Sequence, residues 1–495
     1  MAHCINIEDE CIDTGMGSGG YNNSKQDEEV KKLVEFIEND LKQAPTSPNY
    51  TIYRVLKPLR QVKPEAYTPR LVSIGPFHRY SIDLWPMEAH KLRLLKRFLG
   101  RISQSSLADY VREMKKLENE ARQCYSEVIP FKTDEFVRMM VVDSCFILEL
   151  ILGWKKFFRN DPIFNEAWMP QIVRDLMLLE NQLPFFVLQK LYMLHMTISD
   201  ADAIYHVTQE FLQDFLPHSP SITPKASIPQ RFCTWVMSIF NSELVLKQES
   251  PPGFNSHLEL NIDQEESPEE SSRGPKPQLP RGGASHLLDY VRYLLVLELP
   301  SRHEEMQVQR THSATELKKA TVKFKKSKTT RFSDISFKEG VLRIPAINVD
   351  DLTESVLRNL IALEQSHQYD TKYVISYAVF MDDLINSPED VRLLQVEEIF
   401  ESLTNLEEVA ELFNQLLKEV TQPHDLCFSK VYNEVETYYN NPWRKLLEKF
   451  QEHIGSLKNK YFKNPWAFMS FVAATALLGL TIAQTVAAFK YSKKG

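Results

Sequence analysis

Glycine is scarce in this sequence, with 15 residues among 495. Loops that cradle phosphate groups depend on glycine, and the pattern Gly-x-x-x-x-Gly-Lys-Ser/Thr does not occur. The Gly-x-Ser-x-Gly elbow of hydrolases and the His-Glu-x-x-His pattern of zinc enzymes are also missing. These absences exclude the familiar motifs of nucleotide and hydrolytic enzymes, and we expect no cofactor.

Cysteine is sparse as well, with six residues spread between positions 4 and 427 and no Cys-x-x-Cys pair. This usage favours a reducing compartment over a disulfide framework. The first residues have neither the basic stretch nor the apolar core of a signal peptide. The net charge of -8 gives no general attraction to nucleic acid, so we expect no nucleic-acid partner.

Charge is absent from one long run near the end of the sequence, the 26 residues from Asn464 to Phe489. A helix over 465–489 has the length to cross a hydrocarbon core of about 30 Å. Trp466 and Phe489 lie near its ends, where aromatic rings settle at membrane interfaces, and the basic tail 490–495 follows. We predict a C-terminal transmembrane helix here; a buried core helix is the alternative.

Small residues recur every four positions along this run, at Thr475, Gly479, Ala483 and Ala487. Such a face lets two helix backbones approach, and Gln484 could hydrogen-bond across the contact. Self-association is one hypothesis, and the alternative is that the alanines are apolar filler. With no earlier span, we expect a single-pass membrane protein with a large cytosolic amino-terminal part. The plasma membrane is favoured, with an endomembrane as the alternative.

The preceding sequence predicts a mainly α-helical globular body over 25–461, after a polar segment 1–24 that we expect to be disordered. The run 133–152 is apolar on nearly every face and predicts the central core helix. Prolines at 58, 64, 69 and 76 argue against helix over 53–78. The helical pattern covers 26–43, 86–101, 105–128, 133–152, 175–190, 201–216, 228–246, 353–366, 371–386, 388–400, 404–421, 428–439 and 443–461. Ser313-Ala-Thr-Glu316 predicts a capping box at the start of a short helix.

Two stretches depart from the helical pattern. Residues 335–344 alternate between polar and apolar around Gly340, which predicts a small β-hairpin. Residues 248–284 are rich in proline and glutamate and poor in apolar residues, which predicts an acidic, disordered insertion. The expected fold is therefore a helical body with one hairpin and a protruding insertion.

Several blocks, in this order, resemble the plant membrane-protein family called domain of unknown function 247. The resemblance runs from about residue 50 to the end, apart from the insertion. One departure is His78-Arg-Tyr80, where relatives often have His-His-Gly. The matching blocks are Tyr53-Arg-Val55, Ala66-Tyr-Thr-Pro69, Val72-Ser-Ile-Gly-Pro-Phe-His78, 139–150, 175–186, Ser313-Ala-Thr-Glu-Leu317, 340–345, 358–365, Phe380-Met-Asp-Asp-Leu384 and Pro465-Trp466.

The resemblance implies a plant-specific, single-span membrane protein without an established enzymatic activity. Some grass relatives are associated with self-incompatibility, the recognition between pollen and stigma. No residue of this sequence assigns the chain to that group.

Carboxylates among apolar residues are the best candidates for chemistry. Asp175 and Glu180, like Asp143 and Glu149, could be acid–base groups with a raised pKa. We favour the alternative that they hydrogen-bond helix ends or pair with arginines in the core. A metal site at His303-Glu-Glu305 and His312 is less favoured than ordinary surface polarity, because its spacing is loose.

A basic stretch, from Lys318 to Arg331, contains no acidic residue. It could contact anionic lipid headgroups or the acidic insertion, and a solvated loop is the favoured alternative. Its cations are Lys318, Lys319, Lys323, Lys325, Lys326, Lys328 and Arg331.

These observations favour an interaction, recognition or signalling protein at a membrane, with an unknown protein partner and no catalysis. The alternative is a membrane-tethered enzyme that uses the region of Asp175 and Glu180. The two alternatives make different predictions. An enzyme needs a pocket with converging polar groups there, whereas a scaffold would bury those acids in satisfied pairs.

Overall fold

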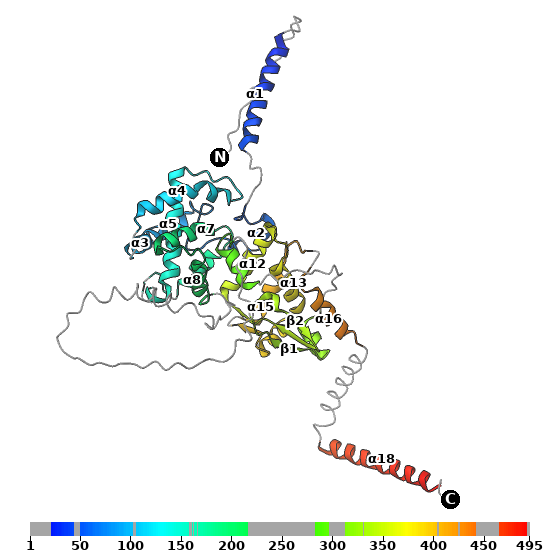
Figure 1. Cartoon of the computed structure of the whole chain (residues 1–495). Coiled ribbons are helices and arrows are strands. Elements are labelled where there is room, and N and C mark those ends of the chain that lie inside the picture. Colours follow the sequence, from blue (N-terminus) through cyan, green and yellow to red (C-terminus); the bar gives the residue numbers. More distant parts are fainter. Residues whose placement is uncertain are drawn as a thin grey trace, which may run out of the picture. The chain divides into compact units, whose positions relative to one another are not determined.

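The computed structural model (Figure 1) divides the chain into two units, residues 1–49 and 50–495. It describes residues 21–43, 50–101, 105–157, 161, 163–165, 167–215, 283–296, 312–329, 331–402, 405–423, 426–441 and 465–492. The predicted helices over 228–246 and 443–461 lie outside the described residues. Almost all of the acidic insertion 248–284 and the metal candidate His303-Glu-Glu305 do too.

The first unit contains one helix, α1 (Tyr21–Gln43). It begins before the predicted start at residue 26 and includes the end of the segment that was expected to be disordered. Its apolar stripe follows the helical period but is exposed, with side-chain exposures from 47% to 67% at Val30, Leu33, Val34, Ile37 and Leu41. The periodicity therefore predicted the helix but not the environment of its apolar face.

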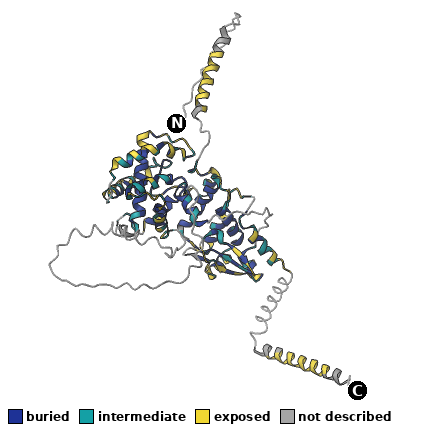
Figure 2. Cartoon of the chain, in the orientation of Figure 1, coloured by how far each residue is buried: buried dark blue, intermediate teal, exposed yellow. Residues whose placement is uncertain are grey.

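In the second unit, α5 (Thr133–Phe157) is the central helix of the first group of elements. It packs against α3, α4, α7 and α8. Most of its side chains from residue 136 to 151 are buried, which confirms the predicted core helix (Figure 2). The group comprises α2 (Lys57–Val62), η1 (Pro64–Ala66), η2 (Ile82–Leu84), α3 (Trp85–Gly100), α4 (Leu107–Gln123), α5, α6 (Met169–Leu176), α7 (Phe185–Met196) and α8 (Ala203–Leu212).

Helix α12 (Asp351–Ser366) has the same central place in the second group and also contacts α6 and η1 of the first. Asp350 caps it by accepting hydrogen bonds from the backbone N–H groups of Leu352 and Thr353. The other helices are α10 (Leu287–Leu295), α11 (Ala314–Lys319), α13 (Tyr373–Leu384), α14 (Pro388–Val396), α15 (Leu406–Leu416) and α16 (Ser429–Tyr439), with η4 (Phe332–Asp334). The Ser313-to-Glu316 capping box predicted at the start of α11 is present.

Strands are more numerous than the sequence predicted. The expected hairpin is confirmed as β2 (Ser336–Lys338) paired antiparallel with β3 (Val341–Ile344). A third strand, β1 (Lys323–Lys326), pairs with β3 in parallel and completes a sheet of order β1-β3-β2. β4 (Ile347–Val349) and β5 (Phe400–Ser402) form a second, parallel pair. The predicted helix 388–400 thus ends at Val396, and its last residue belongs to a strand.

Helix also occurs where prolines argued against it. Pro58 lies in the first turn of α2 and Pro64 opens η1. At a helix start the backbone N–H has no partner within the helix, so a proline costs little there. The prediction of an extended stretch over 53–78 is wrong for these two short elements.

The expected fold class needs a second correction at α18 (Pro465–Ser492). Within the described ranges, no helix combines the length and the apolarity needed to cross a membrane, so the predicted transmembrane helix over 465–489 is wrong. The prediction weighed the absence of charge, but uncharged residues are not all apolar. Polar residues interrupt this run at Ser470, Thr475, Thr481, Gln484 and Thr485.

Candidate functional site

Residues 70–75 are an irregular segment whose backbone N–H groups are satisfied by side chains. The amides of Arg70, Leu71 and Val72 donate to the Asp175 carboxylate, at 2.7–3.1 Å. The amide of Ile74 donates to Asn181 Oδ1 at 2.7 Å. A buried segment without a strand partner needs acceptors of this kind. The family block 175–186 therefore accepts from four amides of residues 70–74, and Asp143 of the block 139–150 accepts from the Gly75 amide at 3.0 Å.

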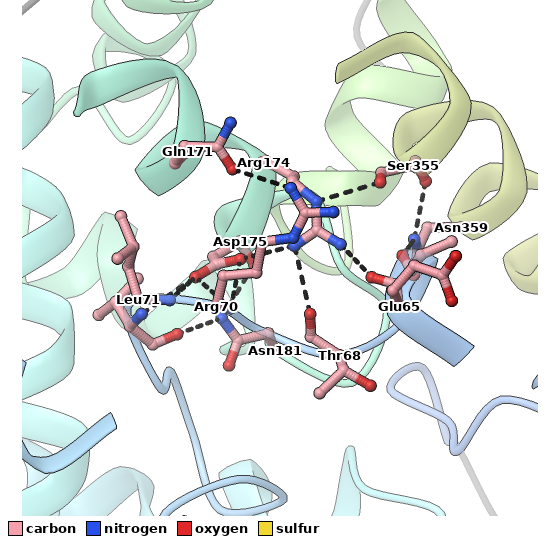
Figure 3. A network of polar contacts seen from close by, with 12 residues as sticks. Glu65, Thr68, Arg70, Leu71, Gln171, Arg174, Asp175, Asn181, Ser355 and Asn359 are labelled. Atoms are coloured by element: carbon pink, nitrogen blue, oxygen red, sulfur yellow. Dashed lines mark hydrogen bonds and ion pairs between the residues drawn. The ribbon is translucent and has the colours of Figure 1, made fainter. Parts of the chain in front are cut away.

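Arg174 extends this network towards α12, as Figure 3 shows. Its Nη1 donates to Asp175 Oδ1 at 2.9 Å, and its Nε donates to Ser355 Oγ at 3.1 Å. Its Nη2 donates to the Glu65 carbonyl oxygen. On the same helix, Asn359 donates to the Ala66 carbonyl oxygen at 2.8 Å. The two groups of elements are thus joined by buried, charge-assisted hydrogen bonds.

Glu180 is the centre of a second network, with a side-chain exposure of 2%. It accepts hydrogen bonds from the Val55 amide at 2.7 Å and from Arg60 Nη2 at 2.5 Å. Arg54 Nη1 and His78 Nε2 each lie 3.3 Å from Glu180 Oε2. Burial raises the pKa of Glu180, but the interactions with His78, Arg60 and the Val55 amide outweigh it and lower the pKa to about 2.

The other interior carboxylates are held in the same way. Asp143 is fully buried and lies 2.7 Å from Lys91 Nζ. Glu149 is paired with Arg97 and Arg101 at 3.0 and 2.7 Å. Burial raises the pKa of Asp143, and the nearby Lys91 ammonium opposes that shift. Both acids are satisfied in pairs, as expected of a scaffold.

A polar cleft of about 720 Å³ lies beside the Arg174 network. It is bounded by residues 62–70, by α12 and by α15. Ser355 and Glu65 connect the two features, because each lines the cleft and also accepts from Arg174. The network therefore fixes one wall of the cleft relative to another.

Charges in the cleft differ in how far they are neutralised. Glu354 lies 2.7 Å from Lys63 Nζ and 2.8 Å from Arg358 Nε. Burial raises the Glu354 pKa, and these two cations outweigh it, so the pKa is lowered overall. The carboxylates of Glu65, Glu408 and Glu411 are exposed and have no ion-pair partner among the described residues. Arg70 also lines the cleft as an exposed cation, but five carboxylates against three cations leave the lining with a net negative charge.

The cations of the predicted basic stretch 318–331 lie in different elements of the structure. Lys318 Nζ lies 2.7 Å from Glu397 Oε1, and Lys319 follows it at the end of α11. Lys323, Lys325 and Lys326 belong to β1, so the favoured alternative of a solvated loop is wrong there. Lys328 is exposed and Arg331 is half-buried.

Other predicted site residues are scattered. His312 lies 3.3 Å from a Glu436 carboxylate oxygen and stacks on Tyr439, and its proposed metal partners at 303–305 lie outside the described residues. Thr475, Gly479, Ala483 and Gln484 are exposed on α18. The side chains of Trp466, Ala487 and Phe489 lie outside the described residues. Self-association, the membrane partner and the cellular location stay predictions.

Comparison with known proteins identifies the family of this chain. The model of a family described as a plant protein of unknown function, DUF247, matches residues 52–480. The chain belongs to the DUF247 family. The buried networks around Asp175 and Glu180 lie inside the matched region, and so does the cleft.

Two relatives of this DUF247 chain come from Arabidopsis thaliana. A putative UPF0481 protein is 27% identical over 500 residues, covering 91% of this chain and 92% of its own length. A second UPF0481 protein is 29% identical over 463 residues, covering 90% of this chain and 88% of its own length. No solved structure matches the chain.

The cleft was missed by sequence reasoning. Its walls come from residues near positions 65, 355 and 410, which are joined only by tertiary packing. A partial signal was present, because Glu408 and Glu411 are three positions apart and so share one face of the predicted helix 404–421.

Proposed function

We propose that this DUF247 protein is an interaction protein whose cleft binds a basic segment of a protein partner. The observation that carries the proposal is the set of exposed, uncompensated carboxylates of Glu65, Glu408 and Glu411 in the cleft. Lysine and arginine side chains complement such a surface and extend far enough to reach it.

The state of the interior acids supports binding over catalysis. Asp175 and Glu180 are buried and saturated with hydrogen bonds from residues 54–72. A general acid or base must reach a substrate atom within hydrogen-bond distance. The cleft, in contrast, is open to a partner, and its volume lies in the range of ligand-binding cavities.

A peptide-binding assay tests the proposal. Fluorescence polarisation would compare labelled lysine-rich, glutamate-rich and neutral peptides of equal length against the full chain. We expect a preference for the lysine-rich peptide that declines as salt is added. Glu408→Gln/Glu411→Gln should weaken this binding by about fivefold, because two exposed ion pairs are lost at about 0.5 kcal/mol each.

The matched control is Glu120→Gln/Glu210→Gln, which removes the same charge from exposed positions on α4 and α8. It should leave the affinity nearly unchanged. Equal weakening by both variants would mean that only net charge matters and that the cleft is not the binding site. Equal affinity for all three peptides would refute the proposal.

A further inference from the structure

The sheet β1-β3-β2 has one face covered by the protein and one face exposed. Buried Phe324, Leu342 and Phe337 come from the three strands, and Phe337 packs edge-on against Tyr438 of α16 at 5.3 Å between ring centroids. Figure 1 shows β2 beside α16. Because successive side chains point to opposite faces, the alternate residues point away from this core.

The exposed face is strongly basic. Register places Lys325, Arg343 and Ser336 in one row across the sheet. The neighbouring row is Lys323, Val341 and Lys338. Four of these six residues are cations, none has an ion-pair partner among the described residues, and no carboxylate lies between them. We call Lys323, Lys325, Lys338 and Arg343 the basic face.

The ordinary explanation of lysines on small sheets covers only part of this pattern. Edge strands such as β1 and β2 often bear lysine, which prevents pairing with other chains. Arg343, however, is on the central strand β3, which has no edge to protect. It lies directly opposite Lys325, and like charges in that position destabilise a sheet. A partner that neutralises the charge explains why both are present.

We propose that the basic face docks on the surface of an anionic lipid bilayer. A bilayer surface is extended and negatively charged, and it attracts clustered lysine and arginine without requiring a shaped pocket. No aromatic residue lies in either row, so the face has no platform for stacking nucleic-acid bases. It also has no large apolar anchor of the kind that dominates protein–protein interfaces.

The proposal includes residues that the basic stretch 318–331 did not contain. Lys338 and Arg343 belong to the hairpin and join Lys323 and Lys325 only through strand pairing. Lys318, in contrast, is neutralised by Glu397 and is not part of the face. Contact with lipid is therefore set by the sheet and not by the run of lysines in the sequence.

Vesicle sedimentation of the full chain tests this docking. Vesicles of phosphatidylcholine alone are compared with vesicles that also contain phosphatidylserine. We expect sedimentation to require phosphatidylserine and to decline with salt. Lys325→Gln/Arg343→Gln should reduce the partition coefficient about 25-fold, since each cation near an anionic surface contributes about fivefold. Removing two like charges from one sheet should preserve folding, which thermal melting checks.

The control variant Lys96→Gln/Lys132→Gln loses the same charge from exposed lysines that have no ion-pair partner among the described residues, and it should sediment like the natural protein. Three outcomes would overturn the proposal. These are equal sedimentation with neutral vesicles, an equal loss in the control variant, and binding of poly-glutamate through Lys325 and Arg343 without any binding to anionic vesicles. The last result would assign the face to an acidic protein partner.

Discussion

Carboxylates occupy two contrasting environments in this protein. Asp143, Asp175 and Glu180 are buried and bonded to cations or backbone amides, and they connect segments that are distant in the sequence. Glu408 and Glu411 are exposed in the cleft without a described partner. The same chemical group therefore stabilises the fold in one region and remains available to a ligand in the other. Variants of the buried acids should therefore change the stability of the fold, and variants of the acids in the cleft should change ligand binding.

The largest effect on stability is expected for Asp143→Leu. This change removes one of the two carboxylates beside the fully buried Lys91 ammonium, which keeps Glu88 at 2.6 Å, and it also leaves the buried Gly75 amide without its acceptor. Together these losses should cost about 3–5 kcal/mol. Urea unfolding of the full chain measures the change. Adding Lys91→Met should recover part of the loss, because the pair is then replaced by apolar groups and Glu88 keeps its pairing with Arg79, whereas the Gly75 amide stays without an acceptor. No recovery in the double variant would show that cavity formation, and not the unpaired charge, causes the loss.

A smaller loss is expected for Glu180→Gln, on the order of 2–3 kcal/mol at pH 7, since several charged hydrogen bonds weaken together. The pKa of Glu180 is about 2 in the folded protein, against an ordinary value of 4.5. Its stabilisation is therefore present above pH 4.5 and is lost as the pH falls towards 2. Unfolding curves of the two proteins should converge over that range, and a constant difference would contradict the assigned role.

The buried side chain of His286 should make the stability of the protein depend on pH. Burial lowers the pKa of His286 to about 4, and it outweighs the Asp289 charge and the hydrogen bond to the Thr51 carbonyl oxygen, which both raise the pKa. The stabilisation that the neutral His286 ring contributes is fully present above pH 6.5 and is lost as the pH falls towards 4. His286→Asn keeps a helix cap and should reduce the loss between pH 7 and pH 5 by roughly 1–2 kcal/mol.

Exposed His206 on α8 provides the control for that experiment. His206→Asn should leave the pH dependence of the melting temperature unchanged. If both variants flatten the profile equally, the buried ring is not the source of the effect.

The smallest effect on stability is expected in the cleft. Glu408→Gln/Glu411→Gln should change the free energy of unfolding by less than about 0.5 kcal/mol, as is usual for exposed side chains. The same variant is expected to bind the basic peptide about fivefold more weakly. A large destabilisation measured by urea unfolding would show that these acids belong with the interior group, and the contrast between the two environments would disappear.

Local sequence predicted most helices of the body because their stabilising contacts recur with the helical period. The core helix at 133–152 and the capping box at Ser313 are examples, and each depends on residues within one turn or one face. Strand β1 was missed because its partner is β3, whose pairing residues start 18 positions later, and Lys323-Phe-Lys-Lys326 has little apolar content of its own.

The roles of the buried acids were predictable only as alternatives. Apolar neighbours around Asp175 and Glu180 indicated burial, but their partners are backbone amides and arginines of residues 54–72. Because these partners are distant in the sequence, local sequence patterns do not identify them. For the C-terminal helix the sequence reasoning predicted too much, because the absence of charge over 465–489 was taken as a sign of greater apolarity than the helix has.

The contacts near residue 284 have a practical consequence. The backbone N–H of Ala284 donates to the Tyr205 hydroxyl on α8 at 2.9 Å, and the backbone N–H of Phe185 donates to the Ser285 carbonyl oxygen at 2.8 Å. His286, Asn359 and Arg174 then connect the portions of the chain before and after 216–282. A break anywhere in that stretch severs none of these bonds. The molecule is therefore suited to assembly from two separately expressed polypeptides, so that each half can be labelled or exchanged on its own.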